Sequence, residues 1–341
     1  GSEMCIRDSN KQVASRDVTG YFLVKNGEFA YNKSYSNGYP WGAIKRLDKY
    51  DMGVLSTLYI VFRPTEINSQ FLVSYYDTTR WYREVSKNAA EGARNHGLLN
   101  IAPTDFFNTL LVVPKIVDEQ EKIGSFFKQM DNTIALHQRK LDLLKEQKKG
   151  YLQKMFPKNG EKVPELRFAG FADDWEERKL NENVENIGTG RSSFKAGLDY
   201  SEQTPYEVLG STSVISYSDS FDHSGNFVLT ARVGANAGNL YKHSGNVKIS
   251  DNTVYIQSKN LEFIFYLLTK YDLKKLAFGT GQPLIKASEL KNLKLFFPKT
   301  FGEQQKIGSF FQQLDETIAL HQRKLDLLKE QKKGFLQKMF V

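Results

Sequence analysis

The chain of 341 residues is 40% hydrophobic and 13% aromatic, which is typical of a folded protein with room for more than one buried core. Its single cysteine, Cys5, excludes a disulfide framework and indicates a reducing, cytoplasmic environment, and no apolar run approaches the roughly 20 residues of a membrane span. The formal net charge of +8 is compatible with a polyanionic partner such as nucleic acid, and equally with a solvated basic surface.

The N-terminal part of the chain predicts a strand-rich domain. Residues 1–10, GSEMCIRDSN, show no periodicity, and we interpret them as a leader outside the fold. Residues 11–118 form the first predicted domain. Its apolar runs 21–24, 54–62 and 110–113 are β-branched or aromatic and are bounded by Gly, Asn and Pro, which predicts strands. The aromatic run 70–76 is compatible with either a strand or a helix.

Residues 119–156 predict a long helix, which Pro157 ends. A second domain, residues 157–302, follows the same plan as the first. We expect a strand and a loop in 227–241, a strand at 254–257 and an apolar helix at 263–271, followed by the loop 277–283 and the run 293–299. Residues 303–341 predict a second long helix.

The two predicted helices are nearly identical in sequence. Residues 119–156 and 303–340 differ at five of 38 positions, at an offset of 184 residues, and Pro114 and Pro298 share that offset, so the chain is an internal repeat. Apolar residues in each copy alternate at spacings of three and four, which is a heptad pattern that needs a partner helix, and the other copy is the obvious partner. The predicted seam residues are Ile123, Phe127, Ile134, Leu141, Leu144, Ile307, Phe311, Ile318, Leu325 and Leu328. His137 and Lys148 are polar residues at seam positions, which either fix the register or lie where the seam is solvated.

The sequence lacks the usual catalytic patterns. We find no Asn-Pro-Pro-Tyr or Asp-Pro-Pro-Tyr methyltransferase motif, no GxxxxGK[ST] phosphate loop, no GxSxG elbow, and no CxxC or HExxH metal spacing. We therefore predict no catalytic residue, no metal ligand and no cofactor in this chain, and this argues against a self-contained nuclease or methylase.

The order of domain, helix motif EQxKIGxFFxxxDxxIALHQRKL, domain and the same helix motif resembles the DNA-specificity subunit of Type I restriction-modification systems. PELRFAGFADDWEERKL (164–180) is similar to the opening of that family's target-recognition domains. The resemblance implies an α+β fold, in which two strand-rich recognition domains alternate with two long helices that pair as an antiparallel coiled coil with pseudo-twofold symmetry. No RFxxFxxxW motif precedes the first domain, so we expect that domain to be shortened at its start.

The resemblance also implies a function. Each domain would read one half of a split, asymmetric site in double-stranded DNA, and the helices would dock two methyltransferase subunits, which a restriction subunit joins. S-adenosylmethionine, ATP and Mg are then expected on the partner subunits, and this chain would be non-catalytic. The alternative is a coiled-coil scaffold that joins proteins without reading DNA.

Base edges are read by Arg, Asn, Gln, Ser and Thr side chains. The loops richest in these types supply the candidate DNA-binding residues Asn37, Arg46, Arg80, Arg83, Arg94, Asn95, Thr189, Arg191, Ser192, Ser211, Thr212, Arg232, Asn236 and Gln282. Outward-facing cations on the helices are the candidates for partner docking, namely Arg139, Lys140, Lys145, Arg323, Lys324 and Lys329.

Overall fold

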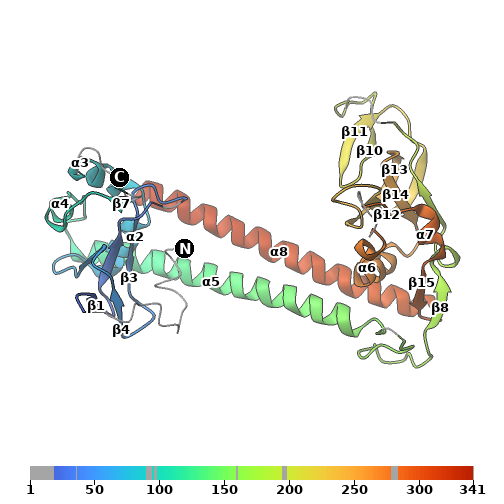
Figure 1. Ribbon diagram of the computed structural model, residues 1–341, viewed down its shortest axis with the longest axis horizontal. Helices are drawn as coiled ribbons and strands as arrows, with labels where there is room; N and C mark the ends of the chain where they lie inside the picture. The colour runs from blue at the N-terminus through green and yellow to red at the C-terminus, as the bar shows by residue number, and fades with distance from the viewer. Residues whose placement is uncertain are drawn as a thin grey trace. The chain divides into compact units, whose positions relative to one another are not determined.

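The computed structural model describes residues 19–35, 37–89, 94–95, 98–158, 160–193, 198–277 and 283–340. The chain divides into two compact units: unit 1 is the chain up to Arg139 together with the chain from Arg323, and unit 2 is Lys140–Gln322. Each unit holds one globular domain and a part of both long helices, α5 (Val117–Lys154) and α8 (Phe301–Met339), as Figure 1 shows. The prediction of an α+β fold with an internal repeat is confirmed.

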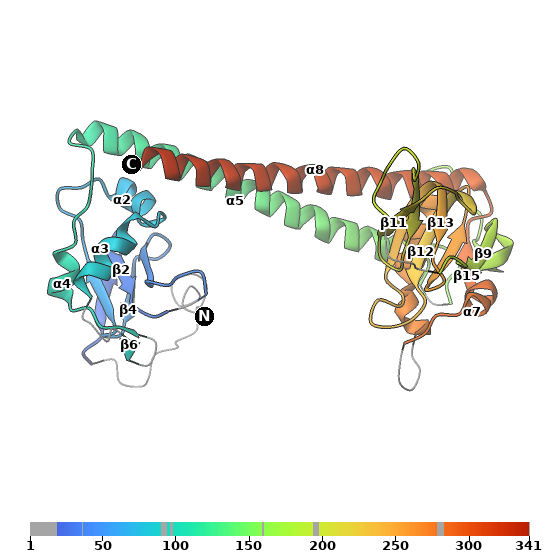
Figure 2. The same ribbon diagram turned by 90° about the horizontal axis from the view of Figure 1, so that it is seen from above.

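The globular part of unit 1 consists of short strands and short helices (Figure 2). Strand β2 (Phe29–Asn32) lies between β3 (Ala43–Arg46) and β5 (Tyr59–Phe62), antiparallel to both. Two smaller antiparallel pairs are β1 (Phe22–Lys25) with β4 (Met52–Leu55), and β6 (Arg94–Asn95) with β7 (Leu98–Leu99). The helices are α2 (Ser69–Tyr76), α3 (Arg80–Asn88) and α4 (Pro103–Phe107). All four residues of β2 are buried, so β2 is the centre of this domain.

The aromatic run 70–76, which the sequence left open, forms helix α2. The side chain of Asn68 accepts hydrogen bonds of 3.0 Å from the backbone N–H groups of Gln70 and Phe71, so it caps the helix N-terminus. Phe71 and Tyr75, four residues apart, are both buried. The cap and the four-residue spacing favour a helix over a strand.

The globular part of unit 2 is larger. Its main sheet has the strand order β11-β10-β13-β12-β14-β9. These strands are β9 (Asn186–Thr189), β10 (Tyr206–Leu209), β11 (Val214–Ser218), β12 (His223–Ala231), β13 (Leu240–Ile249) and β14 (Thr253–Gln257). A separate antiparallel pair is β8 (Glu176–Lys179) with β15 (Lys294–Phe297). The helices are α6 (Leu261–Tyr271), α7 (Ala287–Asn292) and the 3-10 turns η1 (Leu180–Glu182) and η2 (Leu273–Leu276). Strand β14 and helix α6 confirm the sequence predictions at 254–257 and 263–271.

Within unit 1, the start of α5 packs against the end of α8. The rings of Phe127 and Phe340 lie 5.8 Å apart, and those of Phe126 and Phe335 lie 5.2 Å apart. Unit 2 has the same arrangement between the end of α5 and the start of α8, where Tyr151 contacts Phe310 at 5.1 Å. Later residues of α5 contact earlier residues of α8, so the helices are antiparallel in both units, as the resemblance implied.

The predicted seam residues lie at these helix contacts or along the same helix faces. Ile123, Phe127, Leu141, Leu144, Ile307, Phe311 and Leu325 are buried, and Ile134, Ile318 and Leu328 are half-buried. The polar seam residue Lys148 forms an ion pair of 2.6 Å with Asp315 in unit 2. A charged partner therefore accounts for a lysine at this seam position.

Glycines bring each domain close to its helix. A Cβ atom at Gly124 would lie 2.6 Å from the backbone nitrogen of Phe71 in α2, and one at Gly308 would lie 2.8 Å from the backbone nitrogen of Phe263 in α6. Gly124 and Gly308 are repeat equivalents. The two units therefore use the same contact, helix backbone against helix backbone, to hold a globular domain on its long helix.

Two strand predictions in unit 1 were wrong in detail. The run 54–62 is interrupted: β4 ends at Leu55 and β5 begins at Tyr59, whose backbone N–H bonds the carbonyl of Ser56 in a turn. Residues 110–113 form no strand, although the equivalent residues of unit 2 form β15. The partner of β15 is β8, and among the described residues of unit 1 no strand pairs with 110–113. A lone β-prone run does not become a strand without a neighbour.

Candidate nucleic-acid interface

Three loops of unit 2 meet at the turn Ser250–Asn252, which joins β13 to β14. Ser192, in the loop after β9, donates its backbone N–H to Ile249 at 3.1 Å and accepts one from Asp251 at 3.1 Å. Arg232, directly after β12, donates its backbone N–H to Asn252 at 2.8 Å, and Ser250 donates to Leu209 at the end of β10 at 2.9 Å. We call Thr189–Ser192, Gly210–Ser213, Arg232–Asn236 and Ser250–Asn252 the loop cluster.

The loop cluster brings together most of the residues that the sequence singled out in the second domain. The exposed ones are Arg191, Thr212, Arg232 and Asn236, and the half-buried ones are Thr189, Ser192 and Ser211. Gln282 lies outside the described residues. The neighbouring Pro283 accepts a hydrogen bond of 3.0 Å from the backbone N–H of Gly234, so Pro283 lies beside the Arg232 loop.

The cluster combines cations, amides and hydroxyls with one acidic edge. The hydroxyl of Ser192 donates a hydrogen bond of 3.0 Å to the carboxylate of Asp222. The same carboxylate contacts the imidazole ring of His223. The carboxylate fixes the Ser192 side chain, so this hydroxyl is less available to a ligand than that of Thr212. The guanidinium groups of Arg191 and Arg232 have no ion-pair partner among the residues the structure describes.

Two tyrosines beneath the cluster stay neutral. Burial raises the pKa of Tyr255, and the positive charge of Arg191 offsets only part of that rise. The Tyr255 hydroxyl accepts a hydrogen bond of 3.2 Å from the side chain of Asn186. Burial also raises the pKa of Tyr241, whose hydroxyl donates to the carbonyl of Gly210. Tyr241 therefore ties the Gly210–Ser213 loop to strand β13 without adding negative charge.

Unit 1 has a loop in the same topological place. β2 lies between β3 and β5 as β12 lies between β13 and β14, so the loop 33–42 corresponds to 232–239. Both loops carry an exposed candidate asparagine, Asn37 and Asn236. Arg80 and Arg83 are exposed on α3, and Arg94 and Asn95 belong to β6.

Arg46 is not free to contact DNA. Its guanidinium donates to Asp48, to the hydroxyl of Ser69 at 2.9 Å and to the side-chain carbonyl of Gln70 at 2.7 Å. The side chain is 12% exposed, so Arg46 fastens β3 to the start of α2. The sequence selected Arg46 by residue type alone, and only the structure places it at the end of strand β3.

The sequence search missed the turn at the centre of the cluster. Ser250, Asp251 and Asn252 stand between β13 and β14 and have the composition of a tight turn, although the two strands are not neighbours, because β12 lies between them in the sheet. This signal would have placed the end of β13 close to the start of β14, but it would not have placed Arg191 or Arg232 beside the turn.

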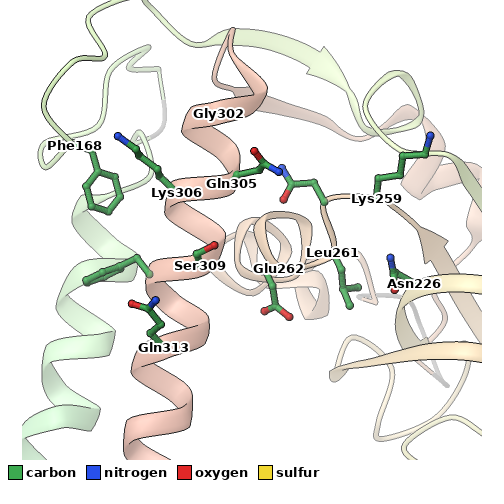
Figure 3. A pocket seen from close by; sticks show the side chains of 12 residues that line it. Phe168, Asn226, Lys259, Leu261, Glu262, Gly302, Gln305, Lys306, Ser309 and Gln313 are labelled. Atoms are coloured by element: carbon green, nitrogen blue, oxygen red, sulfur yellow. The ribbon is translucent and has the colours of Figure 1, made fainter.

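Potential metal ligands and one surface pocket were further candidates for a functional site. The described residues hold no group of three His, Cys, Asp or Glu side chains that could bind a metal ion. A surface pocket of about 800 Å³ lies between the start of α8, the start of α6 and Phe168 (Figure 3). Its single carboxylate, Glu262, is paired with Lys242, so the pocket offers no free acid for catalysis. None of the helices in the described ranges combines the length and apolarity that crossing a bilayer requires.

Comparison with known proteins finds similarity to specificity subunits of restriction-modification systems. Residues 172–330 match the family described as Type I restriction modification DNA specificity domain. The Type I restriction enzyme MjaVIII specificity subunit of Methanocaldococcus jannaschii is 22% identical over 275 residues, which are 70% of this chain and 63% of that protein. The Type I restriction enzyme EcoprrI specificity subunit of Escherichia coli is 28% identical over 96 residues, 27% of this chain and 24% of that protein.

Solved structures share the fold. The S subunit of the Type I restriction-modification system from M. genitalium is 14% identical, with a TM-score of 0.62, over 93% of this chain and 84% of that one. A chain from a study of assembly and conformational transition of the type I R-M system is 16% identical, with a TM-score of 0.54, over 96% of this chain and 85% of that one. The domain match, the sequence relatives and the shared fold agree with the duplicated helix: residues 172–330 match the Type I restriction modification DNA specificity domain, and the chain is similar to Type I specificity subunits over most of its length.

Proposed function

We propose that this chain is a non-catalytic subunit that reads a bipartite, asymmetric site in double-stranded DNA and docks methyltransferase subunits and, through them, restriction subunits. The observation that carries the proposal is the convergence of three loops rich in Arg, Asn, Ser and Thr on the turn Ser250–Asn252. Unit 1 has a loop of the same topology that carries Asn37. Two reading surfaces in one chain match a site with two half-sites.

The exposed side chains suit the chemistry of base edges. Arginine donates two hydrogen bonds to guanine O6 and N7, and asparagine bonds adenine N6 and N7. Arg191, Arg232 and Asn236 therefore supply base reading, while Thr212 and the backbone amides around it suit phosphate contacts. In unit 1 we assign the same role to Asn37, Arg80 and Arg83.

The long helices supply the docking surface for the methyltransferases. The side chains of Arg139, Lys140, Lys145, Arg323, Lys324 and Lys329 are all exposed. The helices are nearly identical in the two repeats while the domains differ, as expected if the helices bind two copies of one partner. S-adenosylmethionine, ATP and Mg then belong to the partner subunits, and the assembly acts on DNA in the cytoplasm.

One experiment tests the proposal. The chain is produced with the methyltransferase subunit of its own system, and the methylated adenines are mapped on random-sequence DNA. A split motif with a constant gap supports the reading. Arg232→Ala should relax one half-site only, whereas Lys294→Ala, an exposed cation on β15 outside the loop cluster, should leave the motif unchanged.

The same experiment separates the scaffold alternative. If a stable complex formed and methylated DNA without a sequence motif, the chain would be a structural scaffold and would not read DNA. If Arg232→Ala weakened methylation at every sequence equally, Arg232 would be a phosphate contact rather than a base-reading residue.

A further inference from the structure

A groove on the surface of unit 2 lies between the end of α5, helix α6 and the first half of α8. Its volume is about 580 Å³. Helix α6 supplies two of the nine lining residues, Thr269 and Lys270, and the long helices supply the other seven. These seven are Lys145, Lys148, Lys149, Leu152, Gln153, Asp315 and Ile318. We call the nine residues together the lysine groove.

The lysine groove carries more positive than negative charge. Its one carboxylate, Asp315, pairs with Lys148 at 2.6 Å and accepts a hydrogen bond of 2.7 Å from the hydroxyl of Tyr266. Three further lysines of the groove form no ion pair among the described residues: Lys145, Lys149 and Lys270. No Asp or Glu stands at 159, 194–197 or 278–282, the positions of unit 2 outside those residues. Within unit 2 these three cations therefore lack an anion of their own.

Unit 1 contains the same helix residues. At the repeat offset of 184 residues, the seven helix residues of the lysine groove correspond to seven identical ones: Lys329, Lys332, Lys333, Leu336, Gln337, Asp131 and Ile134. Lys332 pairs with Asp131 at 2.7 Å, as Lys148 pairs with Asp315. Any difference in charge between the two places must therefore come from the globular domains.

The close approach of each domain to its long helix aligns α2 with α6. Phe71 in α2 and Phe263 in α6 each place a backbone nitrogen against the repeated glycine of the long helix. Six residues further on, unit 1 has Asp77 and unit 2 has Thr269. Both residues face the long helices, because Asp77 contacts Lys332 and Thr269 lines the lysine groove. Asp77 and Thr269 are therefore equivalent positions.

The two positions differ in charge. The carboxylate of Asp77 contacts Lys332 at 3.0 Å and Lys45 at 2.9 Å. Thr269 is uncharged, and its hydroxyl donates to the carbonyl of Phe265 in its own helix at 2.7 Å. The next residue of α6 is the cation Lys270. Unit 1 thus supplies from its own domain an anion that the domain of unit 2 does not supply.

We propose that the lysine groove of unit 2 binds an acidic segment of the methyltransferase subunit, so that the partner supplies the carboxylate that Asp77 supplies in unit 1. A carboxylate between Lys149 and Lys270 forms charge-assisted hydrogen bonds. The half-buried side chains of Leu152 and Ile318 suit an apolar side chain of the same segment, which favours a polypeptide over the phosphates of nucleic acid. The inference rests on the proposed docking of methyltransferases to the long helices.

The two docking sites of the chain then differ in charge although their helices are the same. Docking on unit 2 should weaken more steeply with salt than docking on unit 1, because ions screen the attraction between the exposed lysines and the partner's carboxylate. The measurement is mass photometry of the full chain with the methyltransferase subunit of its own system at increasing NaCl, which counts the subunits that remain bound.

Matched variants assign the site. Lys149→Glu and Lys270→Glu should each weaken the docking of one methyltransferase subunit by about tenfold or more, because the reversed charge repels the partner's carboxylate. Lys291→Glu is the control, since Lys291 is exposed on α7 of the same unit and lies outside the groove.

Thr269→Asp tests the equivalence with Asp77 directly. The new carboxylate supplies the missing anion within unit 2, so it should weaken the docking of one subunit and make the remaining binding less dependent on salt. Thr269→Asn, which has the same size and no charge, should leave docking unchanged. Thr269 is exposed, so both variants keep the fold of unit 2.

The outcomes separate this inference from the proposed function. If the unaltered chain bound no methyltransferase subunit, the proposed docking and the inference would both be wrong. If two subunits docked as tightly to Lys149→Glu and Thr269→Asp as to Lys291→Glu, the inference alone would be wrong. If the variants kept both subunits but bound duplex DNA more weakly, the groove would hold phosphate, and the assignment to an acidic polypeptide would be overturned.

Discussion

Lys332 on α8 lies 2.7 Å from the carboxylate of Asp131 on α5, and the same pair recurs in the other unit, where Lys148 lies 2.6 Å from Asp315. In unit 1 the lysine is on α8 and the aspartate on α5, and in unit 2 the lysine is on α5 and the aspartate on α8. Antiparallel pairing of a repeated helix requires this reversal. Such a pair forms only in one register, so it supports the in-register alignment of the heptads.

Lys332 should matter more than Asp131 to the stability of unit 1. Lys332 is 17% exposed and also contacts Asp77 at 3.0 Å, whereas Asp131 is 45% exposed. Lys332→Met should lower the free energy of unfolding of unit 1 by about 2 kcal/mol, because it removes a partner from a half-buried carboxylate. Asp131→Asn should cost less than about 1 kcal/mol.

Hydrogen exchange of the amides in α2 and in the start of α5 is the suitable measurement, because a chain of two units need not unfold in one step. Protection of α6 in unit 2 serves as the internal reference. Equal losses for Lys332→Met and Asp131→Asn would mean that the contact with Asp77 adds nothing.

The environment of Asp77 predicts acid sensitivity in unit 1. Burial alone would raise the pKa of Asp77, but the charges of Lys45 and Lys332 outweigh burial and hold the pKa below its ordinary value of 3.8. Because the folded pKa is lower than the unfolded one, this stabilisation is complete above the unfolded pKa and is lost as the pH falls through the folded pKa. Unit 1 should therefore lose stability below a pH of about 4.

Asp77→Asn provides the check on this pH dependence. The variant should be less stable than the unaltered chain at neutral pH, and the difference should shrink as the solution is acidified below the unfolded pKa. The measurement is urea unfolding between pH 3 and pH 7, followed by the fluorescence of Trp41 and Trp81 of unit 1 in a chain that carries Trp175→Phe. A difference that grew on acidification would show that Asp77 is not stabilised by its lysines.

The repeat made the helices and their pairing predictable, because heptad spacing over 38 residues depends on local sequence alone. The loop cluster was predictable in its residue types but not in its geometry. Arg191 and Arg232 are 41 residues apart in sequence. Their loops come together because Arg232 and Ser192 both form backbone hydrogen bonds with the turn Ser250–Asn252, and no spacing rule predicts these bonds. The error at 110–113 has the same origin, because strand formation depends on a distant partner. Arg46 illustrates the converse: its residue type suggested a ligand, and tertiary contacts gave it a structural role.

The glycines of the long helices should respond in opposite ways to alanine. Gly124→Ala and Gly308→Ala place a Cβ against the backbone of α2 or α6 and should destabilise their units by about 1–3 kcal/mol. Gly150→Ala and Gly334→Ala meet no atom within 4 Å and should stabilise the helix by up to about 1 kcal/mol. Both pairs are repeat equivalents, so each unit contains its own control. Circular dichroism melting of the four variants is the test, and destabilisation by Gly150→Ala would contradict the assignment.

Glu303 and Glu119 are equivalent in sequence but should differ in their contribution to stability. Glu303→Gln leaves Arg167, which is 11% exposed, without its carboxylate partner, so unit 2 should lose about 3 kcal/mol. Glu119 is exposed and has no such arginine among the described residues, so Glu119→Gln should change stability by less than about 0.5 kcal/mol. The measurement is hydrogen exchange in α8 and α5, which reports each unit separately. A large loss for Glu119→Gln would contradict the expectation that burial, and not position in the repeat, decides the contribution of this glutamate.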